Sequence, residues 1–191
     1  MRKIVIITTL SLLYFYCGAQ SVHGVSIGYA PWGVERLTTW NDNKSYRGNH
    51  TFIRPAIKLD FEFRHGGASI QQLGLVYSTT YADLTYTDSL LIPYHYQGNF
   101  RQIGMYYRPG WTIMPRRRVQ IPILFSFGLN YCFGDLLLRN TLMTEIGLIA
   151  QLKIYITNWM AIYGGFTVQG GISRVGVNSR MYSDFGLLFN F

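Results

Sequence analysis

The chain has 191 residues, of which 49% are apolar, 16% aromatic and only 14% charged, with a formal net charge of +8. An ordinary soluble domain has about 25% charged residues, and a mean hydropathy of +0.11 is too polar for a bundle of membrane helices. The composition favours a membrane β-barrel, because apolar and polar residues alternate along its strands and average out.

Residues 1–19 have the pattern of a secretory signal peptide. Basic residues at positions 2 and 3 precede an apolar stretch over residues 4–16, and small residues offer a cleavage site after Ala19. We expect this segment to be removed and residues 20–191 to be exported as one barrel domain. A lipoprotein acylated at Cys17 is the alternative, which the bulky aromatic residues before it disfavour. Export also argues against nucleic acid as the partner of this basic chain.

The rest of the chain alternates between apolar and polar residues with a period of two, which indicates strands with one apolar face. Gly, Pro, Asn and Asp separate the alternating stretches, and a polar stretch around residues 41–44 is expected as a loop. No segment holds about 18 uninterrupted apolar residues, the length of a membrane helix. Eight strands are predicted. The fourth returns from a hairpin tip at residues 88–89 through residues 103–107, and the other seven lie at about residues 22–31, 55–64, 73–86, 119–131, 142–154, 160–172 and 180–191.

The last predicted strand ends on an aromatic residue, with Phe185, Leu187, Phe189 and Phe191 at every second position. A terminal strand frays unless something ties it down, and in bilayer hydrocarbon every backbone polar group is satisfied within the chain. Pairing of the last strand with the first meets both conditions by closing a ring. The predicted fold class is all-β, an eight-stranded antiparallel up-and-down transmembrane β-barrel. A soluble β-sandwich or lipocalin-like barrel, with its apolar face inward, is the alternative.

Charged residues occupy the polar face of several predicted strands, most clearly in residues 55–64, where apolar and charged residues alternate strictly. With lipid outside, these charges point into the lumen, which in an eight-stranded barrel is just wide enough for side chains to fill. Four basic and four acidic residues then predict a network of ion pairs and not an open channel. Asp60 and Glu62 also match a glycosidase-like carboxylate pair, but the flanking basic residues favour neutralisation. The predicted network contains Lys58, Asp60, Glu62, Arg64, Glu145, Lys153, Arg180 and Asp184.

Pro122 is unexpected within its predicted strand. Proline has no N–H to donate to the hydrogen-bond ladder and is usually found on edge strands, and a closed barrel has no edge strand. We expect a β-bulge at Pro122, or a strand that starts later than residue 119.

The third and fourth predicted strands are long enough to project beyond a bilayer. Pairing of residues 79–86 with residues 91–98 would form a two-stranded flap, whose polar and tyrosine-rich edge is suited to strand addition by a partner. The candidate partner-binding residues of this flap are Tyr81, Tyr86, Tyr94 and Tyr96.

Two stretches and the export segment resemble a known family. The strand VQIPILFSFGLNY, the terminal YSDFGLLFNF and the signal ending near Ala19 are similar to those of small outer-membrane β-barrel proteins of Bacteroidetes-type bacteria, the OmpX-like and PorT-like group. The resemblance covers residues from about Val22 to Phe191. It implies outer-membrane insertion without catalysis, recognition of the terminal aromatic pattern by the barrel-assembly machinery, and Ile121-Pro122 as a recurrent strand element.

Motifs of common catalytic and metal sites are missing from the sequence. The four His residues, at positions 23, 50, 65 and 95, form no HExxH or paired ligand spacing, and neither GxSxG nor a P-loop occurs. We therefore expect no catalytic residue, no metal and no cofactor. Lipid A deacylases of the outer membrane carry a His-x-Ser element, from which His65 and Ser69 depart in their spacing.

Together these patterns predict an integral outer-membrane protein with a structural or binding role. Its expected partners are outer-membrane lipid and lipopolysaccharide, the assembly machinery during insertion, and an envelope or extracellular protein. A lipid A-modifying enzyme and a subunit of an envelope secretion assembly are the alternatives. The basic run at residues 116–118 fits either contact with anionic head groups or a solvated turn, with Trp111 nearby as an interfacial anchor.

Overall fold

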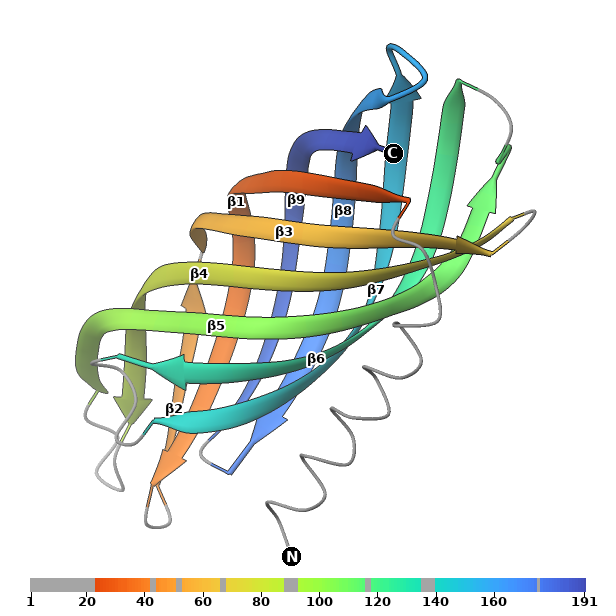
Figure 1. Ribbon diagram of the computed structural model, residues 1–191. Helices are drawn as coiled ribbons and strands as arrows, with labels where there is room; N and C mark the ends of the chain where they lie inside the picture. Colours follow the sequence, from red (N-terminus) through yellow and green to blue (C-terminus); the bar gives the residue numbers. More distant parts are fainter. Residues whose placement is uncertain are drawn as a thin grey trace, which may run out of the picture.

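The computed structural model describes residues 23–41, 44–50, 53–65, 68–87, 93–115, 118–134, 140–174 and 176–191. The predicted signal peptide lies outside them. Among the described residues, no helix is long and apolar enough to cross a membrane. The described residues form nine β-strands (Figure 1): β1 (Gly24–Asn41), β2 (Lys44–His50), β3 (Ile53–His65), β4 (Ser69–Thr87), β5 (Pro93–Ile113), β6 (Val119–Phe133), β7 (Thr141–Tyr155), β8 (Met160–Ser173) and β9 (Gly176–Asn190).

The nine strands form one antiparallel sheet that closes on itself, because β1 pairs with β9 as well as with β3 (Figure 1). β2 pairs with the second half of β1 and β3 with its first half, and both also contact β4. β2 and β3 are therefore two halves of one barrel strand. The ring has eight strands in up-and-down order, which confirms the predicted fold class.

β1 is longer than predicted, and the polar stretch around residues 41–44 is not a long loop. β1 continues to Asn41, and β2 begins at Lys44 in direct register with it. The predicted end at Pro31 was wrong, because the register shift between Tyr29 and Trp32 lets the strand bend and continue. A second shift surrounds Pro55 in β3. At both prolines a bulge absorbs the missing ladder donor.

Pro122 is accommodated differently, and neither the bulge nor the later start predicted there is found. β6 begins at Val119, and Pro122 pairs with Thr112 of β5 without a register shift. On the other side, the ladder to β7 omits Ile121 and Pro122 and resumes in register at Ile123. The missing N–H thus costs ladder pairs on one side of the strand and leaves the register intact.

The two faces of the barrel wall differ sharply in polarity. Among the described side chains, those of β6, β7, β8 and β9 alternate largely between a buried inner position and a more exposed outer position. Buried polar residues of the inner face include Ser26, Gln72, Gln102, Asn130, Gln151 and Thr167. Exposed apolar residues of the outer face include Ile27, Ile57, Ile103, Phe127, Leu148, Val168 and Leu187. A soluble barrel has the opposite arrangement, with its apolar face inward.

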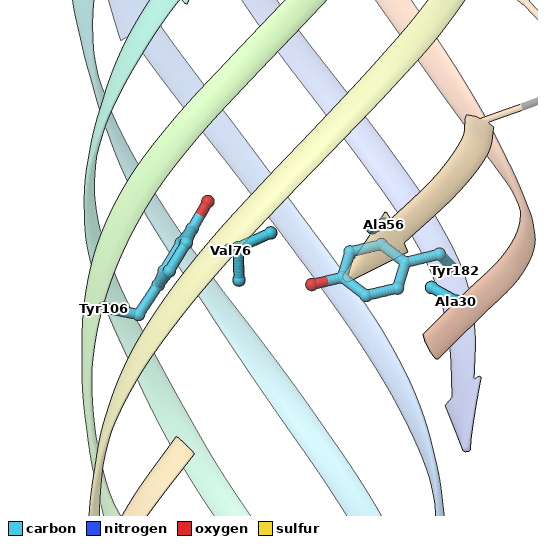
Figure 2. Close-up of a cluster of buried hydrophobic side chains, with 5 residues drawn as sticks. All are labelled: Ala30, Ala56, Val76, Tyr106 and Tyr182. Atoms are coloured by element: carbon cyan, nitrogen blue, oxygen red, sulfur yellow. The ribbon is translucent and has the colours of Figure 1, made fainter. Parts of the chain in front are cut away.

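Apolar side chains fill the lumen between the polar groups. One cluster among the described residues contains Ala30, Ala56, Val76, Tyr106 and Tyr182. Figure 2 shows Val76 between the rings of Tyr106 from β5 and Tyr182 from β9. The small residues on β1 and β3 leave room for these rings, so the centre of the barrel is packed.

The two ends of the barrel are distinct. At the terminal end, defined by His23 and Phe191, the Phe191 amide donates to the His23 carbonyl at 3.0 Å and the Asn190 amide to the Trp159 carbonyl at 2.8 Å. The last strand is thereby tied at its final residue. The loop end, at the bottom of Figure 1, carries the connections β1–β2, β4–β5, β6–β7 and β8–β9.

Candidate functional site

The lumen contains three groups of charged residues, and the first lies toward the terminal end. Glu62 of β3 accepts hydrogen bonds from Lys153 of β7 and from Gln72 at 3.1 Å, and pairs with Arg64 at 2.9 Å. Arg64 also donates to the Tyr155 hydroxyl. Because the Arg64 side chain is 30% exposed while Glu62 is buried, Arg64 caps this group toward solvent.

The second group joins β3 to strands on either side of it. Lys58 pairs with Asp184 of β9 at 3.0 Å, and Asp60 pairs with Arg108 of β5. The Lys58 ammonium also lies 4.5 Å from the centre of the Tyr182 ring, a cation–π contact. All four charged side chains are at most 1% exposed.

The third group surrounds Glu145 of β7 toward the loop end. Its carboxylate pairs with Arg180 of β9 at 2.5 Å and accepts hydrogen bonds from the Tyr106 hydroxyl at 2.6 Å, Gln169 at 2.7 Å and Asn178 at 3.0 Å. A buried carboxylate with this many donors has its charge compensated, which makes its burial tolerable.

All eight charged residues predicted in the lumen are found there, and each takes part in an ion pair. Sequence reasoning missed Arg108 and Glu35, which raise the balance from four to five residues of each sign. Arg108 was missed because the fourth predicted strand ended at residue 107, just before Pro109 and Gly110, although β5 runs on to Ile113. Glu35, which accepts from Asn178 at 3.0 Å, lies in the part of β1 predicted as a loop.

The pairs connect strands that are not neighbours in the ring, such as β3 with β7 and β7 with β9. The Glu62–Lys153 pair joins opposite walls, because β3 and β7 are four strands apart in the ring, whereas the Lys58–Asp184, Asp60–Arg108 and Glu145–Arg180 pairs each span one intervening strand. Together the pairs occupy the space through which an ion would pass. Removing one partner from a buried pair is far more costly than never having had the pair. The arrangement is suited to stiffening a closed barrel.

The β4–β5 hairpin extends past β6 at the loop end, whereas on its other side β2 still pairs with β4 at Arg47–Thr85. The β4–β5 ladder continues to Thr87–Pro93, whereas the β5–β6 ladder ends at Arg101–Phe133. The two predicted flap segments pair, but Thr79 lies opposite Arg101 and not Gly98, so the register differs from the predicted one. Residues 88–92 lie outside the described part. The side chains of the four candidate tyrosines, Tyr81, Tyr86, Tyr94 and Tyr96, also lie outside it. Their backbones are described, and Tyr86 and Tyr94 are register partners in the β4–β5 ladder.

The terminal aromatic pattern lies on the outer face. Phe185 and Leu187 are exposed, and Phe191 is 84% exposed. Phe189 stacks on Trp159 with ring centres 6.3 Å apart. The pattern is thus presented on the outside of the closing strand, next to the terminal end.

Three further features bear on metal binding or catalysis. The described residues contain no group of three or more His, Cys, Asp and Glu that could hold a metal ion. His65 lies opposite Ser69 across the β3–β4 turn, but the side chain of His65 is outside the described part. Cys132 is a free, buried thiol on the inner face of β6.

A closed eight-stranded antiparallel barrel with an apolar exterior and a charged, packed lumen has the architecture of the small outer-membrane β-barrel proteins. No protein-family model matches the sequence, and neither does any curated protein. Neisserial surface protein A has a similar fold, with a TM-score of 0.51 and 12% identity over 87% of this chain and 97% of that one.

Two further solved structures are similar at lower scores. Ail of Yersinia pestis, in complex with the heparin analogue sucrose octasulfate, has a TM-score of 0.41 and 15% identity over 88% of this chain and 100% of that one. The N-terminal β-barrel domain of Pseudomonas aeruginosa OprF has a TM-score of 0.38 and 17% identity over 90% of this chain and 100% of that one.

Proposed function

We propose that this chain is an integral outer-membrane protein whose barrel is a stiff scaffold and whose β4–β5 hairpin binds an envelope or extracellular protein. The observation that carries the proposal is the polarity of the closed wall. Outer-face residues such as Ile146, Trp111 and Ile57 are 64%, 60% and 57% exposed, while charges fill the lumen. Water would make so much exposed apolar surface unfavourable, whereas acyl chains match it.

The closed ring supports membrane residence independently of side chains. A bilayer offers no hydrogen-bond partners to backbone groups, so an open sheet edge would be excluded from it. The β1–β9 ladder removes that edge within the barrel wall. In this proposal the terminal end faces the periplasm, and outer-membrane lipid and lipopolysaccharide surround the wall.

The hairpin supports the binding role. It continues β4 and β5 beyond the point at which the β5–β6 ladder ends. A projecting two-stranded element is suited to add a partner's strand, with main-chain hydrogen bonds supplying affinity and side chains supplying specificity. The proposal assigns no catalysis, because the described acids are committed to donors inside the lumen.

Membrane residence is tested by expressing the full chain with its own leader and separating inner from outer membranes. The expected result is outer-membrane enrichment and a folded band that migrates faster on gels before boiling than after it. A chain that remains in the soluble fraction with the same folded band would overturn the membrane assignment.

The binding role is tested by pull-down of the tagged mature chain in mild detergent, with mass spectrometry of what is retained. Alanine at Tyr81, Tyr86, Tyr94 and Tyr96 should remove a stoichiometric partner while heat-modifiable migration is unchanged. Tyr77→Ala, on the exposed outer face of the same strand, is the control that should retain the partner. Unchanged binding in the four-alanine variant would exclude the hairpin as the binding element.

A further inference from the structure

The alternation between the two faces of β5 continues into the β4–β5 hairpin. Phe100 is 1% exposed on the lumen side, whereas Gln97 and His95 are exposed. Because successive positions of a strand belong to opposite faces, Tyr94 and Tyr96 occupy lumen-side positions of the hairpin. These two tyrosines therefore belong to the face that continues the inner wall of the barrel beyond its loop end.

A row of tyrosines crosses three neighbouring strands at this level. Tyr86 of β4 pairs with Tyr94 of β5, so it shares the lumen-side face. On its other side, β4 pairs with β2 at Thr85–Arg47. One step along that antiparallel ladder, Tyr86 is opposite Tyr46. The backbone register thus brings Tyr46, Tyr86 and Tyr94 to neighbouring positions of one face, although they come from three different strands.

Tyr81 does not belong to this row. It is separated from Tyr86 along β4 by an odd number of positions, which places it on the opposite face of the strand. Its register partner Asn99 likewise alternates with the lumen-side Phe100. The candidate tyrosines of the hairpin therefore divide between its two faces, with Tyr81 alone on the outer one.

The lumen-side positions around the tyrosine row carry uncharged residues. Thr39 of β1 continues the row beside Tyr46. The next lumen-side row toward the barrel contains Leu37, Gly48, Leu84 and Tyr96. The outer positions of the same strands, by contrast, include the basic residues Arg47 and His95. An uncharged face of aromatic, aliphatic and small residues matches an uncharged partner, because burial of an unpaired charge against it would be costly.

The spacing of the row selects one kind of peptide. Neighbouring strands lie about 4.7–4.9 Å apart, so Tyr46 and Tyr94, on either side of β4, occupy positions about 9.5 Å apart. A polyproline II helix has three residues per turn and a rise of about 3.1 Å per residue, or about 9.3 Å per turn. A polyproline II segment laid across the strands therefore repeats in step with the row. A β-strand repeats about every 6.8 Å and does not.

We propose that the row of Tyr46, Tyr86 and Tyr94 binds an uncharged, proline-rich segment of the partner protein in the polyproline II conformation. This inference rests on the protein-binding role proposed above, and it assigns the contact to the lumen-side face of the hairpin and not to its edge. Residues three apart in such a segment stack on Tyr46 and Tyr94, with Tyr86 between them. Binding costs little conformational entropy, because the polyproline II helix is already formed in the free segment.

Binding is measured by the fluorescence polarisation of labelled dodecaproline, titrated with the mature chain folded in neutral detergent. A Gly-Ser repeat peptide of equal length is the comparator, because it is also uncharged but flexible. The wild-type chain should bind dodecaproline at least about tenfold more tightly than the Gly-Ser peptide, the effect of about two aromatic contacts. Heat-modifiable migration of each chain shows that it is folded in the assay.

Single variants locate the contact. Tyr46→Ala and Tyr94→Ala should each weaken dodecaproline binding at least about fivefold, and Tyr46→Phe should retain it, because the ring makes the contact. Tyr46 is the most informative position, since a strand added to the edge of β5 would be separated from it by β5 and β4. Tyr81→Ala is the matched control, because Tyr81 is in the same hairpin but on its outer face. It should bind like the wild-type chain.

The outcomes separate this inference from the proposed function. A four-alanine hairpin variant that still retains the partner in the pull-down would contradict the binding role itself. A folded wild-type chain that binds dodecaproline no better than the Gly-Ser peptide would overturn only the polyproline II segment. Full binding by Tyr46→Ala together with loss in Tyr94→Ala would also overturn the row, in favour of contact at the edge of β5. Equal weakening by Tyr81→Ala would do the same, because both faces would then contribute.

Discussion

Lys58 of β3 and Asp184 of β9 form an ion pair of 3.0 Å across the inner face of β1, with neither side chain more than 1% exposed. The inner position of β1 opposite Lys58 is Gly28, so β1 itself contributes no side chain there, and the Tyr163 hydroxyl occupies the space above the glycine. β3 and β9 are neighbours only through β1, which closes the ring. The pair therefore fastens the barrel at the place where its first and last strands meet.

Removing one member of this pair should cost more than removing both. Asp184→Leu leaves the Lys58 ammonium buried without its carboxylate, and breaking a buried pair in this way costs about 3–5 kcal/mol. The double variant Lys58→Met/Asp184→Leu should be more stable than Asp184→Leu alone. Free energies of unfolding in urea, measured in detergent micelles, give the coupling between the two positions. Strictly additive costs would contradict the pairing.

Gly28 should be intolerant of even one added methyl group. A Cβ at residue 28 would lie 2.0 Å from the Tyr163 hydroxyl oxygen but 3.2 Å from the next ring atom. Gly28→Ala should therefore cost about 1–3 kcal/mol of unfolding free energy, and Tyr163→Phe in the same chain should recover most of it. Gly186→Ala is the control that Tyr163→Phe should not rescue, because its Cβ would also lie 2.2 Å from the Ile27 carbonyl oxygen. Equal rescue of both alanine variants would refute this account.

A positive charge on the outer face should have a cost that depends on depth. Leu148, at the centre of β7, is 52% exposed, so in water Leu148→Arg would be nearly neutral. At a bilayer midplane the same change costs about 2–4 kcal/mol, falling to about 0–1 near the interfaces. Asn140→Arg, next to the loop-end start of β7, should thus be mild. Unfolding from phosphatidylcholine vesicles measures both costs, and equal small values would favour the soluble barrel.

Cys132 should resist alkylation until the barrel unfolds. Its side chain is 0% exposed on the inner face of β6, and only the thiolate of an accessible cysteine reacts quickly. We expect no labelling of the mature chain by N-ethylmaleimide in detergent and complete labelling in urea. Tyr131→Cys in a Cys132→Ala background, at a position that is 43% exposed, should label while folded. Fast labelling of Cys132 in the folded chain would contradict its burial on the inner face of β6.

The predicted charge network shows which lumen residues can be assigned from the alternation of residues along a strand. Lys58, Asp60 and Glu62 were assigned to the lumen because they alternate with apolar residues, and side chains two apart share one face of a strand. Arg108 follows the same parity as Tyr106, yet the adjacent Pro109 obscured it. Proline and glycine are dependable turn markers in short strands, but in a long barrel strand they are carried within the ladder.

The sequence by itself determined the class of structure, the two faces of its strands and the closing role of Phe185 to Phe191, because alternation is a local property of each strand. It did not determine that β1 runs through a bulge at Pro31, that Thr79 lies opposite Arg101, or that Lys153 reaches Glu62. Those relations depend on register, and a shift of one residue exchanges the faces of a whole strand. Only closure of the ring selects the registers in which charges of opposite sign meet inside, so the tertiary structure decided the partners.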